Sequence, residues 1–557
     1  MPTLSALDYL VFVFYFAVVA AYGWWVYRRK RAASASASQD YFLAEGALTW
    51  WAIGASLIAS NISAEQFIGM SGAGFKLGLA IASYEWMAAA TLLVVALFFM
   101  PVYLKNRIVT MPQFLRRRYD ERVATIMAVF WLLLYVVVNL TSILYLGALA
   151  INSISGVPIA GCMLLLALFA VVITLGGMKV IGYTDAIQVL FLVAGGLVTT
   201  YLALDMVAAR YGASGALQGL ALLGRHADDH LHLILRPGHP GFPDLPGLTV
   251  LVGDMWIANL NYWGCNQYIT QRALGADLQT ARAGLLFAAF LKLLMPLIVV
   301  VPGIAAYVLH QGGAFQAGML QDGAVNPDRA YPVLLNLLPS GLKGVAFAAL
   351  TAAVVASLAG KANSIATIFT LDIYRDKLRP QASEAELVRT GKLAVVGAML
   401  LAIAIAPLLG IDKKGGFQYI QEYTGFVSPG VFAMFLLGFF WKRATANAAL
   451  FATLGGFGLS LLLKFLPLAA DLSWLIPTGY AVAGPGGVAE IPFLDRMMIV
   501  FVLCTLGMVL ISLADTGAGS PPAALRIEPA LFRPDRRFAA GAVVVLALLV
   551  AIYSYWW

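Results

Sequence analysis

The stretch Ala59-Ser60-Asn61-Ile62-Ser63-Ala64-Glu65-Gln66-Phe67, followed by Gly69, Gly72 and Gly74, interrupts a long apolar segment that begins near residue 50. A second apolar segment is interrupted in the same way, at Ala258-Asn259-Leu260-Asn261-Tyr262-Trp263-Gly264-Cys265-Asn266-Gln267. Polar groups at membrane depth are unfavourable unless they face a bundle interior or a solute pathway. Two interrupted helices at corresponding positions of two halves are typical of transporters built from inverted repeats. The alternative is a pair of kinked structural helices joined by polar contacts.

The composition places both interrupted segments in a membrane. The chain has 557 residues, of which 61% are hydrophobic and 11% are charged, and its mean hydropathy is +0.84. Soluble domains are about 45–50% apolar and about 25% charged, so a soluble enzyme is excluded. The apolar runs also exceed the roughly ten alternating residues of a β-barrel strand. Cys162, Cys265 and Cys504 all lie in apolar runs and indicate no disulfide framework.

Fourteen segments are long and apolar enough to cross a bilayer as helices, which takes about 20 residues each. They cover residues 6–27, 50–74, 78–104, 123–152, 157–175, 181–206, 249–270, 283–309, 341–371, 393–410, 416–440, 445–467, 491–513 and 538–557. We therefore expect an all-α polytopic membrane protein with 14 transmembrane helices. The interrupted spans, the second and the seventh, are five apart, which predicts two five-helix repeats of opposite orientation. The expected organisation is one transporter domain over 1–557, with repeats at 50–206 and 249–440 and accessory helices at 6–27 and 445–557.

The loop cations predict the orientation of these spans. If the N-terminus lies outside, 24 Lys and Arg residues fall in inner loops and 8 in outer loops. Because cytoplasmic loops carry an excess of Lys and Arg, we expect a multi-pass plasma-membrane protein with both termini outside. The net charge of +8 is then a consequence of topology, and no nucleic-acid partner is expected.

Several polar side chains within the spans predict a solute site. Glu85 and Lys292 are isolated membrane charges that become tolerable as a hydrogen-bonded pair, although such a pair can also be purely structural. The neighbouring amides are Asn61, Gln66, Asn259 and Gln421. This set of donors and acceptors suits a polyhydroxylated neutral solute, whereas an amino acid would need a carboxylate receptor such as a free helix N-terminus. Tyr262 adds an aromatic face that fits a pyranose ring.

At these residues the chain resembles the solute:sodium symporter family, with the closest likeness to bacterial sodium/galactose and animal sodium/glucose cotransporters. Four segments carry the resemblance, namely Ala59 to Gly72, Tyr183-Thr184-Asp185, Asn259 to Arg272 and Phe417 to Gly425. The resemblance implies a transporter rather than an enzyme, with a five-plus-five inverted-repeat core and alternating access. It implies a sugar site formed by Asn61, Gln66, Glu85, Asn259, Lys292 and Gln421, with Tyr262 as the inner gate. Galactose-type relatives have a serine at the position of Ala88, so this chain lacks one hydroxyl contact.

The resemblance also implies a bound sodium ion, and no other cofactor, between the second and ninth spans. Its ligands would be the carbonyls of Ala59, Ile62 and Ala353 and two consecutive serine hydroxyls, but the serine positions hold Ala356 and Ser357. One turn further, an apolar family position is Lys361, which shares a helical face with Ala353 and Ser357. Asp185 matches a family carboxylate beside the exit route of the ion.

Lys361 leaves more than one interpretation open. Its side chain can snorkel toward the inner face, although the inner end of its helix is roughly 15 Å away. Alternatively Lys361, paired with Asp185, occupies or abuts the sodium site and weakens or replaces the ion; proton-coupled or facilitative sugar transport would follow, because buried lysines titrate readily. On the family resemblance we expect sodium-coupled import of a glucose- or galactose-type monosaccharide. A membrane sugar sensor is the alternative of another class.

Overall fold

The structure of the protein is a computed structural model that describes residues 4–28, 37–44, 48–321, 323–408, 416–484, 487–515, 525 and 527–557. Some residues used in the topology prediction lie outside this described part. They are Arg29, Lys30, Arg31, Lys413, Lys414 and Arg526, together with residues 409–410 at the end of one predicted span.

The first half of the chain forms helices of very unequal length. In chain order they are α1 (Ala6–Arg28), α2 (Ala37–Leu43), α3 (Trp50–Asn61), η1 (Glu65–Met70), α4 (Ser71–Leu77), α5 (Ser83–Val94), α6 (Met100–Lys105), α7 (Met111–Arg118), α8 (Glu121–Leu133), α9 (Thr141–Ser155), α10 (Ile159–Leu175), α11 (Met178–Arg210) and α12 (Ala216–His226). Side chains cap the N-termini of α7 and α8. Thr110 Oγ1 accepts the Gln113 N–H at 3.2 Å, and Asp120 Oδ1 accepts the Val123 N–H at 2.9 Å. Such N-caps satisfy donors that have no partner inside the helix.

The second half opens with the other interrupted helix. Its parts are η6 (Val250–Asp254), α13 (Met255–Leu260), η7 (Asn261–Cys265) and α14 (Gln267–Leu274). The helices that follow are α15 (Leu278–Gln311), α16 (Gln316–Met319), α17 (Ala330–Leu337), α18 (Leu342–Ile368), α19 (Glu384–Ile405), α20 (Gly416–Gly425), α21 (Ser428–Phe440), α22 (Ala446–Leu450), α23 (Gly456–Phe465), α24 (Phe493–Ala514) and α25 (Arg536–Tyr555). Two small antiparallel hairpins pair β1 (Leu320–Gln321) with β2 (Ala324–Val325) and β3 (Val482–Ala483) with β4 (Ala489–Glu490).

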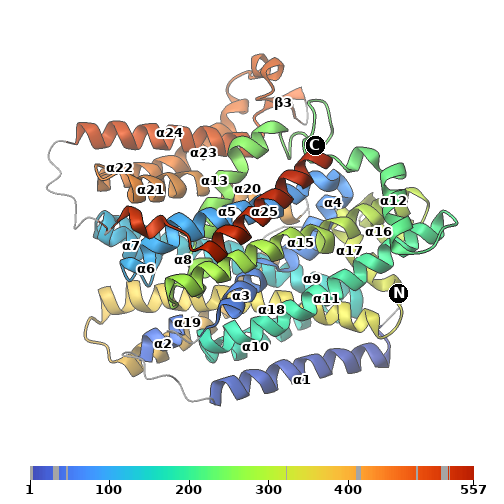
Figure 1. Cartoon of the computed structure of the whole chain (residues 1–557), viewed down its shortest axis with the longest axis horizontal. Coiled ribbons are helices and arrows are strands. Elements are labelled where there is room, and N and C mark those ends of the chain that lie inside the picture. The colour runs from blue at the N-terminus through green and yellow to red at the C-terminus, as the bar shows by residue number, and fades with distance from the viewer. Residues whose placement is uncertain are drawn as a thin grey trace.

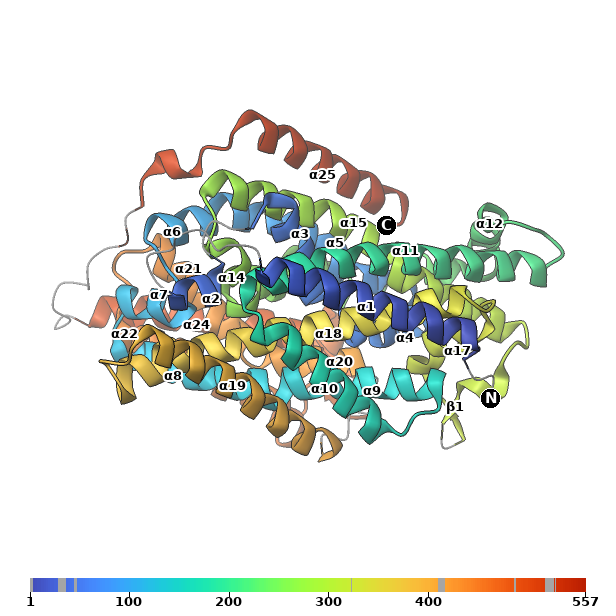
Figure 2. The same ribbon diagram turned by 90° about the horizontal axis from the view of Figure 1, so that it is seen from below.

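The helix α18 lies at the centre of the bundle and α1 at its edge (Figures 1 and 2). The most apolar window of the α18 segment is 89% buried inside the protein, against 28% for α1, so α1 is free to face lipid. The long helices α11 and α15 pack on each other; α11 also packs on α18, and α15 packs on α3, α4 and α5. Small residues such as Ala and Gly, which make up much of α18, permit this close approach of helices.

Both predicted helix interruptions are present and have similar backbone geometry. After α3, Ile62 is extended, with φ −81° and ψ 113°; before α14, Asn266 is extended, with φ −92° and ψ 128°. At the first break the Ser63 N–H is bonded to Gln66 Oε1 at 2.9 Å, and Ser63 Oγ accepts the Glu65 N–H at 3.1 Å. Short polar side chains that bond the backbone in this way compete with the helical pattern.

The described residues contain ten helices that are long and apolar enough to cross a membrane. The shorter apolar helices Ile159–Leu175 and Ser428–Phe440 fall within two more of the predicted spans. The remaining two predicted spans are the interrupted helices, 50–74 and 249–270. The part of the first that follows its break continues into the long helical segment Glu65–Lys105. The structure therefore shows a polytopic helical bundle.

The two ends of the chain lie toward one end of the bundle, and the Arg-rich helix α7 lies toward the other (Figures 1 and 2). Near the N-terminus, Asp8 Oδ1 accepts the backbone N–H groups of Gly341 and Gly344 at 2.8 Å each. Near the C-terminus, the Trp556 carbonyl accepts the Leu233 N–H at 2.7 Å.

Candidate functional site

An ion pair between two helices that are far apart in the sequence lies at the centre of the site. The Lys292 ammonium on α15 donates to Glu85 Oε2 on α5 and to Asn61 Oδ1 at the end of α3. Lys292 and Glu85 are 1% and 3% exposed. The expected pair therefore forms, and the end of the broken helix contributes to it.

Tryptophan side chains enclose this ion pair. The Lys292 ammonium lies 5.2 Å from the centroid of the Trp263 ring. Trp86, the neighbour of Glu85, donates from its indole to the Leu293 carbonyl at 3.1 Å. It also stacks on Trp556, which directly follows α25, with a centroid separation of 6.2 Å. These contacts hold the two charged helices at a fixed separation.

Tyr262 lies between the ion pair and a second group of aromatic rings. Its hydroxyl accepts a hydrogen bond from Asn61 Nδ2 at 2.9 Å. Its ring makes edge contacts with Trp263 and Tyr268, at centroid separations of 5.1 and 5.6 Å. Tyr262 thus joins the two interrupted helices.

The predicted amides all line the same cavity. Three of their oxygens are already engaged, and that of Asn61 is bonded by the Lys292 ammonium. Gln66 Oε1 accepts the N–H and the hydroxyl of Ser63, at 2.9 and 3.1 Å. Asn259 Oδ1 accepts the indole N–H of Trp263 at 3.2 Å. Gln66 and Asn259 therefore have only their amide N–H groups left to offer, and Asn259 Nδ2 also donates to Met255 Sδ at 3.9 Å. Gln421 on α20 adds a further amide.

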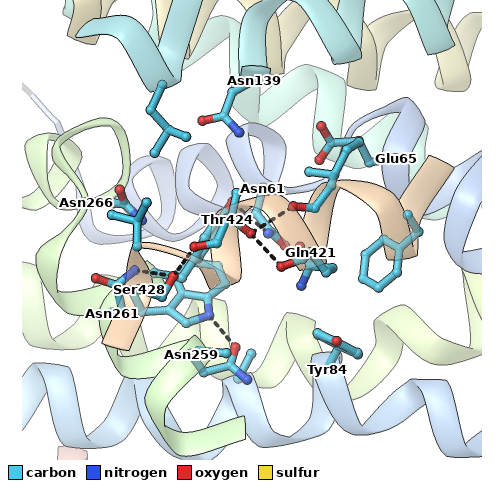
Figure 3. Close-up of a pocket in the computed structure, with 18 of the residues that line it drawn as sticks. Asn61, Glu65, Tyr84, Asn139, Asn259, Asn261, Asn266, Gln421, Thr424 and Ser428 are labelled. Atoms are coloured by element: carbon cyan, nitrogen blue, oxygen red, sulfur yellow. Dashed lines mark hydrogen bonds between the residues drawn. The ribbon is translucent and has the colours of Figure 1, made fainter. Parts of the chain in front are cut away.

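The cavity that these residues share has a volume of about 100 Å³, enough for several water molecules or a small polar solute. In Figure 3, Asn259 and Tyr84 lie toward one end of the view, and Asn139 and Glu65 lie toward the other. The sequence-based site omits several polar residues that line the cavity, namely Glu65, Tyr84, Asn139, Asn261, Asn266, Tyr268, Thr424 and Ser428. Glu65 carried a usable signal, because a carboxylate at membrane depth indicates function by default.

The predicted ion-site residues are buried where α3 meets α18. Ala59, Ile62, Ala353, Ala356 and Ser357 are each at most 1% exposed. Ser357 Oγ donates to the Ser60 carbonyl at 2.9 Å, which leaves its lone pairs for a cation. The Ser63 N–H, the usual helical partner of the Ala59 carbonyl, is bonded to Gln66 instead. Carbonyls released at such a break are the groups that coordinate sodium in discontinuous membrane helices, so the residues present fit the ion.

Asp185 does not pair with Lys361, contrary to one of our predictions. Ser56 Oγ of α3 donates to Asp185 Oδ2 at 2.5 Å. The buried Arg272 of α14 donates from Nε to Ser56 Oγ and to the Ser56 carbonyl, at 3.0 and 3.2 Å. The positive group beside Asp185 is therefore Arg272, which also donates to the Tyr268 carbonyl.

Lys361 faces the cavity rather than the membrane surface. It is 3% exposed, and its ammonium lies 4.8 Å from the centroid of the Tyr268 ring. The side chain lines the same cavity as Asn61, Glu65 and Lys292. The prediction that Lys361 snorkels to the inner face is therefore wrong.

Comparison with known proteins identifies this architecture. The model of the sodium:solute symporter family matches residues 41–456. The chain belongs to the sodium:solute symporter family. It is similar to the sodium/glucose cotransporter of Vibrio parahaemolyticus, with 44% identity over 562 residues covering 100% of this chain and 99% of that protein. It is also similar to the sodium/myo-inositol cotransporter 2 of Oryctolagus cuniculus, with 34% identity covering 91% of this chain and 76% of that protein.

A solved structure shares the fold of this symporter. The structure of a Na+-coupled sialic acid symporter in a substrate-bound, outward-open state matches with a TM-score of 0.72 and 22% identity, covering 93% of this chain and 99% of that chain. Membership of the sodium:solute symporter family makes this protein a sodium-coupled transporter and not an enzyme, as the sequence indicated. The prediction that Lys361 replaces sodium altogether is not supported by this membership.

Proposed function

We propose that the symporter imports a neutral monosaccharide of the glucose or galactose type together with sodium, by alternating access. The observation that carries the proposal is the Lys292 ammonium, which is held by Glu85 and Asn61 within an amide-lined cavity. Sugar hydroxyls can replace parts of this network, because each of them both donates and accepts a hydrogen bond. The similarity to sodium/glucose and sodium/myo-inositol cotransporters supports a polyhydroxylated solute.

Each predicted site residue then has a role. Glu85 accepts from a sugar hydroxyl, and Lys292 donates to one. The amide groups of the site, on Asn61, Gln66, Asn259 and Gln421, surround the remaining hydroxyls. Tyr262 covers the ring of the sugar and closes its exit until the interrupted helices move.

Sodium would bind at the break of α3, between that helix and α18. The carbonyls of Ala59, Ile62 and Ala353 and the hydroxyl of Ser357 would hold it, one hydroxyl fewer than in relatives because Ala356 has none. The end of a half-helix carries partial negative charge, which favours a cation there. Bound sodium would stabilise the conformation that admits the sugar from outside.

The proposed architecture has fourteen transmembrane helices with a five-plus-five inverted repeat. The ten long helices, two shorter apolar helices and two interrupted helices support that number. The repeats would cover residues 50–206 and 249–440, with accessory helices at 6–27 and 445–557. Both termini would lie outside the plasma membrane, because the Arg-rich α7 lies at the opposite end of the bundle from them.

Purified protein in proteoliposomes is expected to take up labelled D-glucose or D-galactose when sodium flows inward, and not when choline replaces sodium. Unlabelled D-glucose, D-galactose, myo-inositol and sialic acid, added separately as competitors, rank the solutes. Competition by sialic acid alone would contradict a neutral-sugar site. Saturable binding of sugar without uptake would favour the sensor alternative instead.

Restoring the missing hydroxyl is expected to improve galactose transport. Ala88 lines the cavity one turn after Glu85, so Ala88→Ser adds a hydroxyl on the solute side of α5. One neutral hydrogen bond contributes about 0.5–1.5 kcal/mol, which predicts a KM for galactose lower by about two- to tenfold. Ala88→Cys, of similar size but a weaker hydrogen-bonding group, is the matched control. An unchanged KM in Ala88→Ser would place this residue out of reach of the sugar.

A further inference from the structure

Lys361 is a buried cation in the solute cavity that the proposed transport mechanism does not use. No group among the described residues accepts a hydrogen bond from its ammonium, which lies 4.8 Å from the centroid of the Tyr268 ring. A desolvated ammonium is unfavourable unless an opposite charge compensates it. The compensating charge has to lie near the cavity.

Glu65 supplies that charge. Its carboxylate lines the same cavity as Lys361, and opposite charges attract each other strongly in a low-dielectric interior. Glu65 stands at the start of η1, directly beyond the break of α3, and its Oε1 accepts from Ser142 Oγ of α9 at 3.1 Å. Lys361 and Glu65 thus line the same cavity, with Glu65 directly beyond the point where the helix is interrupted.

The charges that line the cavity balance without any added ion. Four lining residues are charged, the carboxylates Glu65 and Glu85 and the ammonium groups of Lys292 and Lys361. Lys292 is bonded to Glu85, so Lys361 is the remaining cation of the lining that balances the charge of Glu65. A sodium ion that enters beside this set therefore adds an uncompensated positive charge.

The ion site is close enough for Lys361 to act on it. Lys361 is one helical turn beyond Ser357, and residues at this spacing lie about 5–6 Å apart at their Cβ atoms. Ser357 itself bonds the Ser60 carbonyl at the end of α3. In a low-dielectric interior two like charges at this range repel each other strongly.

We propose that Lys361 is an affinity-determining residue for sodium: its tethered ammonium neutralises Glu65 and thereby keeps sodium binding at the α3 break weak. The ammonium and the ion compete for the same negative potential, which comes from the Glu65 carboxylate and the free carbonyls of the break. The side chain acts through this potential and not as a ligand. Sodium binding is measured in the absence of sugar and so tests the inference by itself. Only the uptake measurements rest on the proposed function.

Sodium titration of the purified symporter, followed by isothermal calorimetry at constant ionic strength with choline, tests the inference directly. Lys361→Met is expected to lower the dissociation constant for sodium by about tenfold or more, as expected for the removal of a like charge within roughly 10 Å. Lys361→Arg keeps the charge and is expected to bind sodium like the wild type. Lys361→Gln serves as the second neutral variant if the methionine variant folds poorly.

A matched control comes from the same helix. Lys343 is also buried on α18 but lies 18 positions, about 27 Å, from Lys361 along the axis. Lys343→Met is expected to leave the sodium dissociation constant unchanged. If any loss of positive charge from α18 were sufficient, Lys343→Met and Lys361→Met would both lower the sodium dissociation constant.

The role of Glu65 is tested by combining substitutions. Glu65→Gln is expected to weaken sodium binding severalfold, and Lys361→Met/Glu65→Gln to return it near the wild-type value. Equal sodium dissociation constants for wild type and Lys361→Met would overturn the inference while leaving sodium-coupled sugar uptake intact. Absence of sodium binding in both proteins would overturn it together with the sodium-coupled part of the proposed function. Loss of sugar uptake alone, with the expected shift in sodium binding, would overturn only the sugar assignment.

Discussion

Lys292→Met is expected to abolish sodium-driven sugar uptake and to destabilise the folded protein. Methionine occupies similar space but removes the cation that bonds Glu85 and Asn61. Two charge-assisted hydrogen bonds contribute about 1.5–3 kcal/mol each, so a loss of uptake of about 100-fold or more is predicted. The Glu85 carboxylate, 3% exposed, is left unpaired, which destabilises a protein by about 3–5 kcal/mol. Proteoliposome uptake and thermal unfolding in detergent measure the two effects.

A double variant separates stability from transport at this position. Lys292→Met/Glu85→Gln removes both charges, so most of the lost stability is expected to return. Uptake is expected to stay low, because the sugar still lacks a charged donor and a charged acceptor. Recovery of uptake in the double variant would show that the ion pair is structural and that the amides alone bind the solute.

Arg272→Met is expected to cause the second large loss, in stability and in transport together. Arg272 is fully buried and joins α14 to α3 through the hydroxyl and the carbonyl of Ser56. Without the guanidinium, the buried Asp185 carboxylate keeps only the Ser56 hydroxyl. The expected destabilisation is about 3–5 kcal/mol. Transport is expected to fall with it, because α3 and α14 are each one half of an interrupted helix and lose the contact that joins them.

Thermal unfolding with and without sodium measures this loss. Arg272→Met/Asp185→Asn is expected to recover part of the stability, because the buried charge is gone. Arg122→Met is the surface control, since its salt bridge to Asp120 involves an arginine side chain that is 65% exposed and such pairs contribute about 0–1 kcal/mol. An Arg272→Met protein as stable as the control variant would refute the link between the two helices.

The sequence was sufficient to predict both helix interruptions and the Glu85–Lys292 pair. The interruptions are local, because Ser63 and Gln66 bond the backbone within a few residues. The pair was predictable because isolated membrane charges need partners and these two lay in otherwise apolar spans. In both cases a physical requirement, local hydrogen bonding at the break or a partner for a membrane charge, left few alternative structures.

The partner of Lys361 could not be chosen from the sequence. Asp185 and Glu65 are both carboxylates at membrane depth, and neither is near Lys361 along the chain. Asp185 is taken by Ser56 and Arg272, a three-way contact between segments that the sequence alone does not bring together. Glu65 was regarded as part of the break, although its side chain faces the cavity.

The stacked pair Trp86–Trp556 has a practical consequence for anyone labelling the protein. Trp556 is next to the last residue of α25, and the carbonyls of Trp556 and Trp557 bond Leu233 and His232. Through Trp86, the residue after Glu85, this end of the chain is one aromatic contact away from the solute site. An affinity tag or fluorescent reporter fused directly after Trp557 is therefore poorly placed, whereas a fusion before α1 begins at a helix on the edge of the bundle.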